Sequence, residues 1–402
     1  MEWEKGIDGY FLPGRELIME NEGAVKIICK LETSGSQSKI FLGNITQHMR
    51  DVGQEVVVKA YFRGRDISTV TSDFEEDTDA FLKNPTGIDE DEGFNLIFDS
   101  IDLYEVACYN EGRSLSHLNS RFPNLFPYRY GHIIHSKPSK GRVKYPPCRT
   151  NVIEYVSPTL DKVALTLSDE TKTALVKLLF QSVYAMQSVG LVHKDLSLSN
   201  LLTRDNTLKI SDFGSAHNLG FKDYKVGVSD VQTFMDSSEE YPFDASDRFL
   251  GNRLYRPPET YHGLISPRSD VWAAGLIAFS ILTGEHLLPM FLDSSRIFSS
   301  TNISNEGKRL FEAGLDEILR RDRKSLQKYI TERIMDDERL PKEYRMPILH
   351  CCRVSPNTRR NMVKILDTAG IPTPKKITKE PKLFTRENNP HGPAKDDLQF
   401  RF

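Results

Sequence analysis

The 402-residue sequence has few of the features that stabilise small secreted domains or anchor a protein in a membrane. Its five cysteines are odd in number and include no Cys-x-x-Cys pair, so neither a disulfide framework nor a zinc knuckle is predicted. The longest apolar run, Val271 to Leu282, contains Ser280 and is shorter than the ~20 residues that cross a bilayer. We therefore expect a buried helix there and no membrane span. No repeat recurs at a period of about 20 to 50 residues, which excludes solenoids and propellers.

The charge balance argues against a nucleic-acid partner. The 53 Lys and Arg residues against 56 Asp and Glu residues give a formal net charge of -3. This is not the basic excess that holds a phosphate backbone by counterion release. The N-terminal stretch MEWEKGIDGYFLPGRE is acidic and interrupted by Gly and Pro, unlike a signal or transit peptide. Because the cysteine usage also fits a reducing compartment, we expect a cytoplasmic protein, with the nucleus as the alternative.

The first part of the chain is predicted to be rich in strands. From Glu22 to Phe62, short β-branched runs alternate with Gly, Ser and Asn, which is typical of an antiparallel meander. Asp73 to Glu92 then holds nine acidic residues and a single lysine, which predicts a solvated insertion over 63–93. Residues 95–119 have an apolar spacing compatible with a helix, and short strands follow over 122–156.

The second part is predicted to be helical. Ser168 is placed to cap a helix whose apolar residues recur at spacings of three and four through Val189. Helical character continues in three further segments, Asp270–Leu282, Leu310–Leu326 and Pro356–Leu366. The last 32 residues, Ile371–Phe402, are rich in Pro, Lys and Asn and are expected to be disordered. The predicted organisation is an N-terminal extension over 1–21, a strand-rich part over 22–156, a helical part over 157–369 and a disordered tail over 370–402.

The residues with the clearest chemistry lie in the middle of the sequence. Asp195 stands between two apolar stretches, in the run HKDLSLSN over 193–200, where a loop carboxylate can accept a hydroxyl proton. Asn200 and Asp212, which are separated by a predicted hairpin, can bind a hard cation through oxygen. An acid, an amide and a second acid in this order suit Mg²⁺-assisted phosphoryl transfer.

At these residues the sequence resembles the eukaryotic protein kinase family, whose signatures include His-Arg-Asp, an Asn five residues after that Asp, and Asp-Phe-Gly. The resemblance implies an α+β fold with two lobes, an antiparallel β-rich N-lobe and a mainly helical C-lobe. It implies that Asp195 is the catalytic base and that Asn200 and Asp212 bind Mg²⁺, or Mn²⁺ as the alternative metal. It also implies ATP as the phosphoryl donor and places His193 and Phe213 in a hydrophobic spine beneath the site.

Upstream, the run Val56-Val57-Val58-Lys59 resembles the third-strand motif of the family, in which a lysine ammonium is held over the phosphates. The resemblance implies that this lysine pairs with a glutamate on the following helix. Glu111, with leucines four and seven residues later, has the spacing expected of that glutamate. Glu105 on the same stretch stays open as the alternative.

The glycine-rich loop of the family is only partly present. In the stretch Thr33 to Ile40, Gly35 stands at the position of the second glycine, while Thr33 and Ser38 stand where the other two belong. The resemblance implies that Gly35 and Ile40 contact the nucleotide. Because side chains at the other two positions crowd the phosphates more than glycine does, ATP affinity is expected to be weaker.

Between the lobes, Val152 to Val156 resembles the strand that leads into the hinge of the family. By this comparison Ile153 is the gatekeeper, and Glu154 and Val156 offer backbone groups to adenine. Asp161 is placed to contact the ribose.

Further downstream, Gly251 to Glu259 resembles the family's peptide-docking segment, and Asp270-Val271-Trp272-Ala273-Ala274-Gly275 resembles its Asp-x-Trp-x-x-Gly helix. Arg359 stands where the family has the partner of Glu259, so an ion pair between them is predicted. These features imply a protein substrate and disfavour a phosphotransferase that acts on small molecules.

Two departures from the family pattern affect the substrate prediction. Ser197 replaces the usual Lys of serine/threonine kinases, and Asn252 replaces the usual Thr. Serine/threonine specificity is still preferred to tyrosine, and phosphorylation within Asp212 to Glu259 is a hypothesis. The alternative function is that of a pseudokinase or scaffold with little or no phosphotransfer, which binds a regulatory protein through the acidic insertion or the C-terminal tail.

Overall fold

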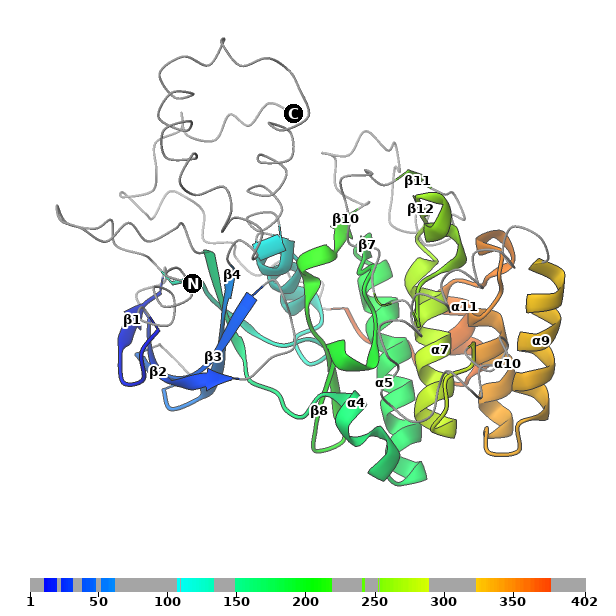
Figure 1. Cartoon of the computed structure of the whole chain (residues 1–402), viewed down its shortest axis with the longest axis horizontal. Coiled ribbons are helices and arrows are strands. Elements are labelled where there is room, and N and C mark those ends of the chain that lie inside the picture. The colour runs from blue at the N-terminus through cyan, green and yellow to red at the C-terminus, as the bar shows by residue number, and fades with distance from the viewer. Residues whose placement is uncertain are drawn as a thin grey trace, which may run out of the picture.

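The alternating β-branched runs and the periodic apolar runs fold into separate parts, a curled sheet and a helical bundle that lie side by side (Figure 1). The computed structural model describes residues 11–19, 23–31, 38–47, 52–61, 107–108, 110–133, 149–218, 241–242, 252, 254–288 and 323–376. The predicted α+β kinase-like fold with two lobes is confirmed. The predicted insertion over 63–93 lies outside the described residues, as does the tail beyond residue 376.

The N-lobe sheet has six antiparallel strands in the order β1-β2-β3-β4-β6-β5. The strands are β1 Glu16–Ile18, β2 Ala24–Leu31, β3 Ser38–Gln47, β4 Glu55–Tyr61, β5 Arg129–Gly131 and β6 Arg149–Glu154. Burial alternates along β3, as expected where one face of a sheet covers a core. Phe41 and Ile45 of β3 pack there with Val56 and Val58 of β4. The predicted meander over β2 to β4 is therefore present.

The sheet begins before the predicted boundary at residue 22. β1 pairs with β2, with Leu17 opposite Val25. Phe11 is buried and stacks on Phe41 with ring centroids 4.6 Å apart. Residues assigned to an extension thus belong to the N-lobe core, because burying an aromatic ring and pairing a strand both favour folding.

A helix between the two lobes carries Glu111. Residues 107–108 and 110–121 are helical, and the cyan helix in Figure 1 lies between the sheet and the C-lobe. Leu115 and Leu118 are buried in the same apolar cluster as the C-lobe helices. The helix therefore links the sheet to the larger core.

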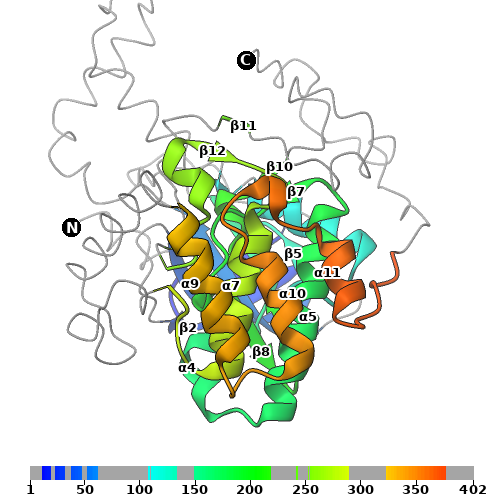
Figure 2. The same cartoon turned by 90° about the vertical axis from the view of Figure 1, so that its right-hand side faces the viewer.

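The C-lobe is built around two central helices, α5 Asp169–Gln187 and α7 Ser269–Thr283. Ser168 caps α5 as predicted, since its side chain accepts a hydrogen bond from the Thr171 amide at 3.2 Å. Trp272 of α7 is fully buried. α10 Lys342–Cys351 packs against α7 and α9 Arg323–Asp336, and α11 Met362–Thr368 packs against α5 (Figure 2). The described residues also form the short helix α4 Leu160–Val163 and the short strands β7 Leu191–Val192, β8 Leu201–Arg204, β9 Thr207–Ile210, β10 His217–Asn218, β11 Tyr241–Pro242 and β12 Leu264–Ile265.

Several predicted helix bounds differ from the structure. The helix predicted to end at Leu326 continues to Asp336, and its first part lies outside the described residues. The segment from Pro356 forms one 3-10 turn and then α11 from Met362, because Asn361 caps a new helix through the Lys364 amide. Ile371 is buried, so the predicted tail begins as packed chain. Of the helices described, none is long and apolar enough to cross a bilayer.

Candidate active site

Lys59 lies between two carboxylates at the junction of the lobes. Its Nζ is 3.1 Å from Oε1 of Glu111 and 2.6 Å from Oδ1 of Asp212. β4 positions the lysine, the helix over 110–121 positions Glu111, and the turn after β9 positions Asp212. The three residues are therefore brought together from separate parts of the chain. Glu105, the alternative partner, lies outside the described residues.

Mutual attraction sets the protonation states in this cluster. Burial acts to lower the pKa of Lys59, but the negative charges of Asp212 and Glu111 outweigh it and raise that pKa. Burial acts to raise the pKa of Asp212, but the Lys59 ammonium outweighs it and lowers that pKa. Lys59 therefore stays positive and Asp212 stays negative at neutral pH. The Asp212 side chain is 47% exposed, so its carboxylate is accessible from solvent.

The β8–β9 hairpin brings Asn200 and Asp212 close together. Leu201 pairs with Ile210 across the hairpin, and the Ser211 amide donates to the Asn200 carbonyl at 2.9 Å. The residue before the hairpin and the residues after it are thus neighbours. Asp212 itself has a φ of 64°, in the left-handed region, and its position is held by the contact with Lys59.

Hydrogen bonds from Asn200 and Asn252 hold the carbonyl and the carboxylate of Asp195. The Asn200 side chain donates to the Asp195 carbonyl at 2.8 Å and to its Oδ2 at 3.3 Å. The backbone amide of Asn252 donates to Oδ1 at 2.8 Å, so the residue that replaces the family's Thr contacts the predicted base through its backbone. Burial, followed by repulsion from Asp212, raises the pKa of Asp195 to about 6. A carboxylate with this pKa is well matched to accept a proton near neutral pH.

The backbone of the Asp195 loop is held from below by a residue whose role the sequence reasoning missed. Asp270 of α7 accepts hydrogen bonds from the His193 amide at 2.6 Å and from the Lys194 amide at 3.1 Å. Lys194 has a φ of 68°, which a non-glycine residue adopts only when its surroundings hold it there. The available signal was an acidic residue at the start of a long apolar run, where a buried charge needs partners.

His193 and Phe213 contact each other beneath the site, as the resemblance implies. Their rings meet edge to face with centroids 4.7 Å apart, and the centroid of the Phe126 ring lies 5.9 Å from that of Phe213. Nε2 of His193 lies 3.0 Å from the Ser211 carbonyl. Burial lowers the pKa of His193 to about 4, so the ring is neutral and donates this hydrogen bond.

The residues expected around the nucleotide base and ribose are less closely tied to this cluster. Ile40 of β3 pairs directly with Lys59, whereas Gly35 lies outside the described residues. The Glu154 carboxylate binds Nζ of Lys209 at 2.6 Å, and Val156 is buried. Asp161 is exposed in the first turn of α4.

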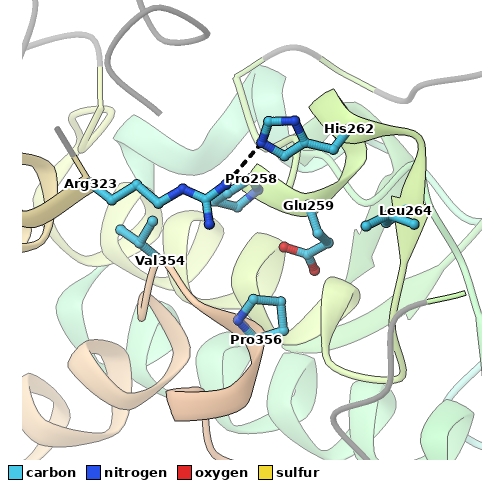
Figure 3. A pocket seen from close by; sticks show the side chains of 7 residues that line it. All are labelled: Pro258, Glu259, His262, Leu264, Arg323, Val354 and Pro356. Atoms are coloured by element: carbon cyan, nitrogen blue, oxygen red, sulfur yellow. Dashed lines mark hydrogen bonds between the residues drawn. The ribbon is translucent and has the colours of Figure 1, made fainter. Parts of the chain in front are cut away.

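The predicted ion pair between Glu259 and Arg359 is present. The guanidinium makes two hydrogen bonds to the carboxylate, at 2.8 and 3.1 Å, and both side chains are fully buried. A cavity of about 250 Å³ adjoins Glu259, and His262 and Arg323 meet at its rim with their nitrogens 2.9 Å apart (Figure 3). This cavity is lined by residues of the C-lobe and is separate from the Lys59 cluster.

The oxygen atoms of the cluster fit a magnesium ion and a triphosphate. The Asp212 side chain is half exposed. The Asn200 side chain donates from its nitrogen to Asp195, which turns its oxygen away from that contact. Carboxylate and amide oxygens are the ligands that Mg²⁺ takes alongside phosphate oxygens, and the Lys59 ammonium suits a phosphate.

A model of the protein kinase domain matches residues 148–369, which is more than half of the chain. This chain belongs to the protein kinase domain family. The resemblance seen in the sequence is therefore confirmed. The matched segment contains Asp195, Asn200 and Asp212, whereas Lys59 and Glu111 lie before it.

Curated relatives of this kinase domain align over part of its length. The serine/threonine-protein kinase atg1 of Dictyostelium discoideum is 32% identical over 124 residues, which cover 30% of this chain and 15% of that protein. The serine/threonine-protein kinase PKH2 of Candida albicans is 29% identical over 176 residues, covering 42% of this chain and 17% of that protein. The mitogen-activated protein kinase pmk-3 of Caenorhabditis elegans is 30% identical over 127 residues, 31% of this chain and 23% of that protein. The aligned part thus spans less than a quarter of each of these relatives.

Proposed function

We propose that this chain is an active kinase that transfers the γ-phosphoryl group of MgATP to a hydroxyl group of a protein. The observation that carries this proposal is the cluster of Lys59, Glu111 and Asp212, with bonds of 3.1 and 2.6 Å to the lysine. Asp195 and Asn200 lie beside it and are hydrogen-bonded to each other. A scaffold that binds no nucleotide has no need for this arrangement of charges.

Five residues of the site have separate roles in the proposed reaction. Lys59 binds phosphate oxygens, and Asn200 and Asp212 hold the metal, which when bound neutralises charge on the phosphates. Asp195 accepts the proton of the substrate hydroxyl while the oxygen of that hydroxyl forms a bond to the γ-phosphorus. The bond between that phosphorus and the bridging oxygen of ADP breaks at the same time, and ADP leaves with the electron pair. The backbone amide of Asn252 keeps the Asp195 carboxylate in place.

Serine and threonine are the proposed acceptor residues. All three relatives described above are protein kinases by name, and two of them are named as serine/threonine kinases. Ser197 takes the place of the family's usual lysine, is buried and lies 2.9 Å from the Ser199 hydroxyl, so it adds no positive charge to the γ-phosphate. A slow rate of transfer follows from that missing charge. Binding of a regulatory protein at residues 63–93 or 370–402 stays a prediction.

The substitution Asp195→Asn tests this function. We expect it to reduce phosphate transfer to a serine/threonine peptide array by at least about a hundredfold while MgATP still raises the melting temperature. Asp205→Asn is the matched control, because Asp205 is exposed at the tip of the β8–β9 hairpin that follows Asp195 and asparagine tolerates its φ of 48°. If the unmodified chain binds MgATP but transfers no phosphate with either Mg²⁺ or Mn²⁺, the scaffold alternative replaces this proposal.

A further inference from the structure

Glu111 accepts hydrogen bonds from two groups besides its partner Lys59. Its Oε1 accepts from Lys59, while its Oε2 accepts from the Tyr61 hydroxyl at 2.5 Å and from Nδ2 of Asn151 at 3.1 Å. We propose that Tyr61 and Asn151 are positioning residues that keep Glu111, and with it the helix over 110–121, in the arrangement that orients Lys59. This inference rests on the proposed function and names the part of the N-lobe that keeps the site assembled.

Strand geometry places both residues against the helix. Tyr61 follows Lys59 by two positions on β4, so the two side chains lie on the same face of the sheet. Asn151 of β6 is directly opposite Lys59 in the antiparallel register. Three neighbouring side chains of two adjacent strands therefore face one carboxylate, which is 1% exposed.

Tyr61 contacts both members of the ion pair. Its hydroxyl binds Glu111, and Nζ of Lys59 lies 5.0 Å from the centre of its ring. An ammonium near an aromatic ring is attracted to the ring's electrons. Burial raises the pKa of Tyr61 well above its ordinary value, so the hydroxyl keeps its proton and donates at neutral pH.

Asn151 also binds the backbone of the helix. Its Nδ2 donates to the Cys108 carbonyl at 3.0 Å as well as to Glu111. Its Oδ1 accepts from Nε of Arg129 at 3.3 Å, which fixes the orientation of the amide. Gly112 leaves room for this contact, because a Cβ atom there would come within 3.0 Å of Oδ1 of Asn151. A side chain at position 112 would therefore crowd the amide of Asn151 and the guanidinium of Arg129.

All three donors to the Glu111 carboxylate, among the described residues, come from β4 and β6. None of them comes from the segment between Asp212 and Glu259 in the part that the structure describes. The described contacts that hold the Glu111 carboxylate therefore come from the N-lobe sheet.

The variant Tyr61→Phe separates this positioning role from packing, because it keeps the ring and removes the hydroxyl. We expect kcat to fall about tenfold to a hundredfold, the effect of losing one hydrogen bond to a charged group, while KM for MgATP changes less than about twofold. Tyr128→Phe is the control, since Tyr128 is 44% exposed in the same lobe and its ring meets the Tyr130 ring edge to face. In a Glu111→Ala background, Tyr61→Phe should add less than about a twofold loss, because the group it acts through is gone.

Amide hydrogen exchange gives a readout that does not depend on phosphate transfer. Amides of the helix over 110–121 should exchange about tenfold faster in Tyr61→Phe and in Asn151→Leu than in the unmodified chain, while those of α7 stay unchanged. Equal acceleration in α7 would show a loss of global stability, and unchanged exchange together with unchanged kcat would show no role for the hydroxyl; either result overturns the proposal. If the unmodified chain transfers no phosphate, the proposed function fails, and the exchange experiment still decides whether the two residues position the helix.

Discussion

Within the described part of the chain, two buried pairs of a carboxylate and a cation, Glu259–Arg359 and Lys59–Glu111, are built in opposite ways. Glu259 and Arg359 have side chains that are both 0% exposed, and every oxygen of the carboxylate meets a nitrogen or hydroxyl of the C-lobe. Lys59 and Glu111 are also buried, but Lys59 has a second partner in Asp212, which is 47% exposed. We call Glu259–Arg359 the sealed pair, because neither side chain reaches solvent. We call Lys59–Glu111 the open pair, because its lysine also binds the half-exposed Asp212.

This difference indicates a structural role for the Glu259–Arg359 pair and fits the chemistry proposed for the Lys59–Glu111 pair. Arg359 also donates to the carbonyls of Arg353 and Arg268, at 3.1 and 2.7 Å, so it joins three segments of the C-lobe. Its guanidinium lies 5.3 Å from the centre of the Trp272 ring. The Lys59 cluster has an excess of negative charge, because one ammonium faces two carboxylates. A magnesium ion can balance that excess, which the sealed pair neither needs nor could admit.

The largest effect is expected from removing the cation of the sealed pair. Arg359→Leu leaves the Glu259 carboxylate charged and buried, so the free energy of unfolding should fall by about 3–5 kcal/mol in urea denaturation. The double variant Glu259→Leu/Arg359→Leu should recover most of that loss, because no unpaired charge stays buried. A loss below about 1 kcal/mol in the single variant would contradict the comparison.

The next effect is expected from removing the cation of the open pair. Lys59→Met should lower kcat/KM for phosphate transfer by about a hundredfold to a thousandfold, because it removes a charge that stabilises the transferring group. The free energy of unfolding should fall by at most about 2 kcal/mol, since Glu111 keeps two donors and Asp212 reaches solvent. Urea denaturation measures that change, and a loss as large as that of Arg359→Leu would mean that both pairs are structural.

The smallest effect is expected from pH. The pKa of Asp195 is about 6, so kcat/KM should fall about tenfold between pH 7 and pH 5 as the base becomes protonated. The pKa of Glu259 is lowered, because the charge of Arg359 outweighs the effect of burial. Stability from a lowered carboxyl pKa is present above the unfolded value and is lost only as pH falls through the folded one. The contribution of Glu259 to stability should therefore persist at pH 5, and a flat rate profile over this range would contradict the assignment of Asp195 as the base.

Local patterns predicted much of this molecule. The alternation in β3 and the cap at Ser168 appear where expected, because each depends on residues a few positions apart. The spacing of leucines after Glu111 singled out that residue, but it left Glu105 open, since both would be exposed glutamates on an isolated helix. Only the packing of the helix against β4 shows Glu111 beside Lys59, 52 residues away in the sequence.

The residues that the sequence reasoning missed depend on contacts between distant segments. Asn151 directly precedes the apolar pair Val152 and Ile153 of β6 and could have been questioned as a buried amide in need of partners. Its partner Glu111 is 40 residues away, and the register of β4 against β6 decides their meeting. Asp270 is 77 residues from the His193 amide that it accepts from, so no local pattern gives its role.

The order of residue types along the chain determined the family, the two-lobed fold and the identity of the acid, amide and lysine that do the proposed chemistry, because those signals are short and local. The tertiary structure alone decided which of these charges are sealed from water and which reach it, and which neutral side chains hold them in place. Burial and hydrogen bonding between distant strands and helices set the protonation of each group, and those contacts exist only once the chain has folded.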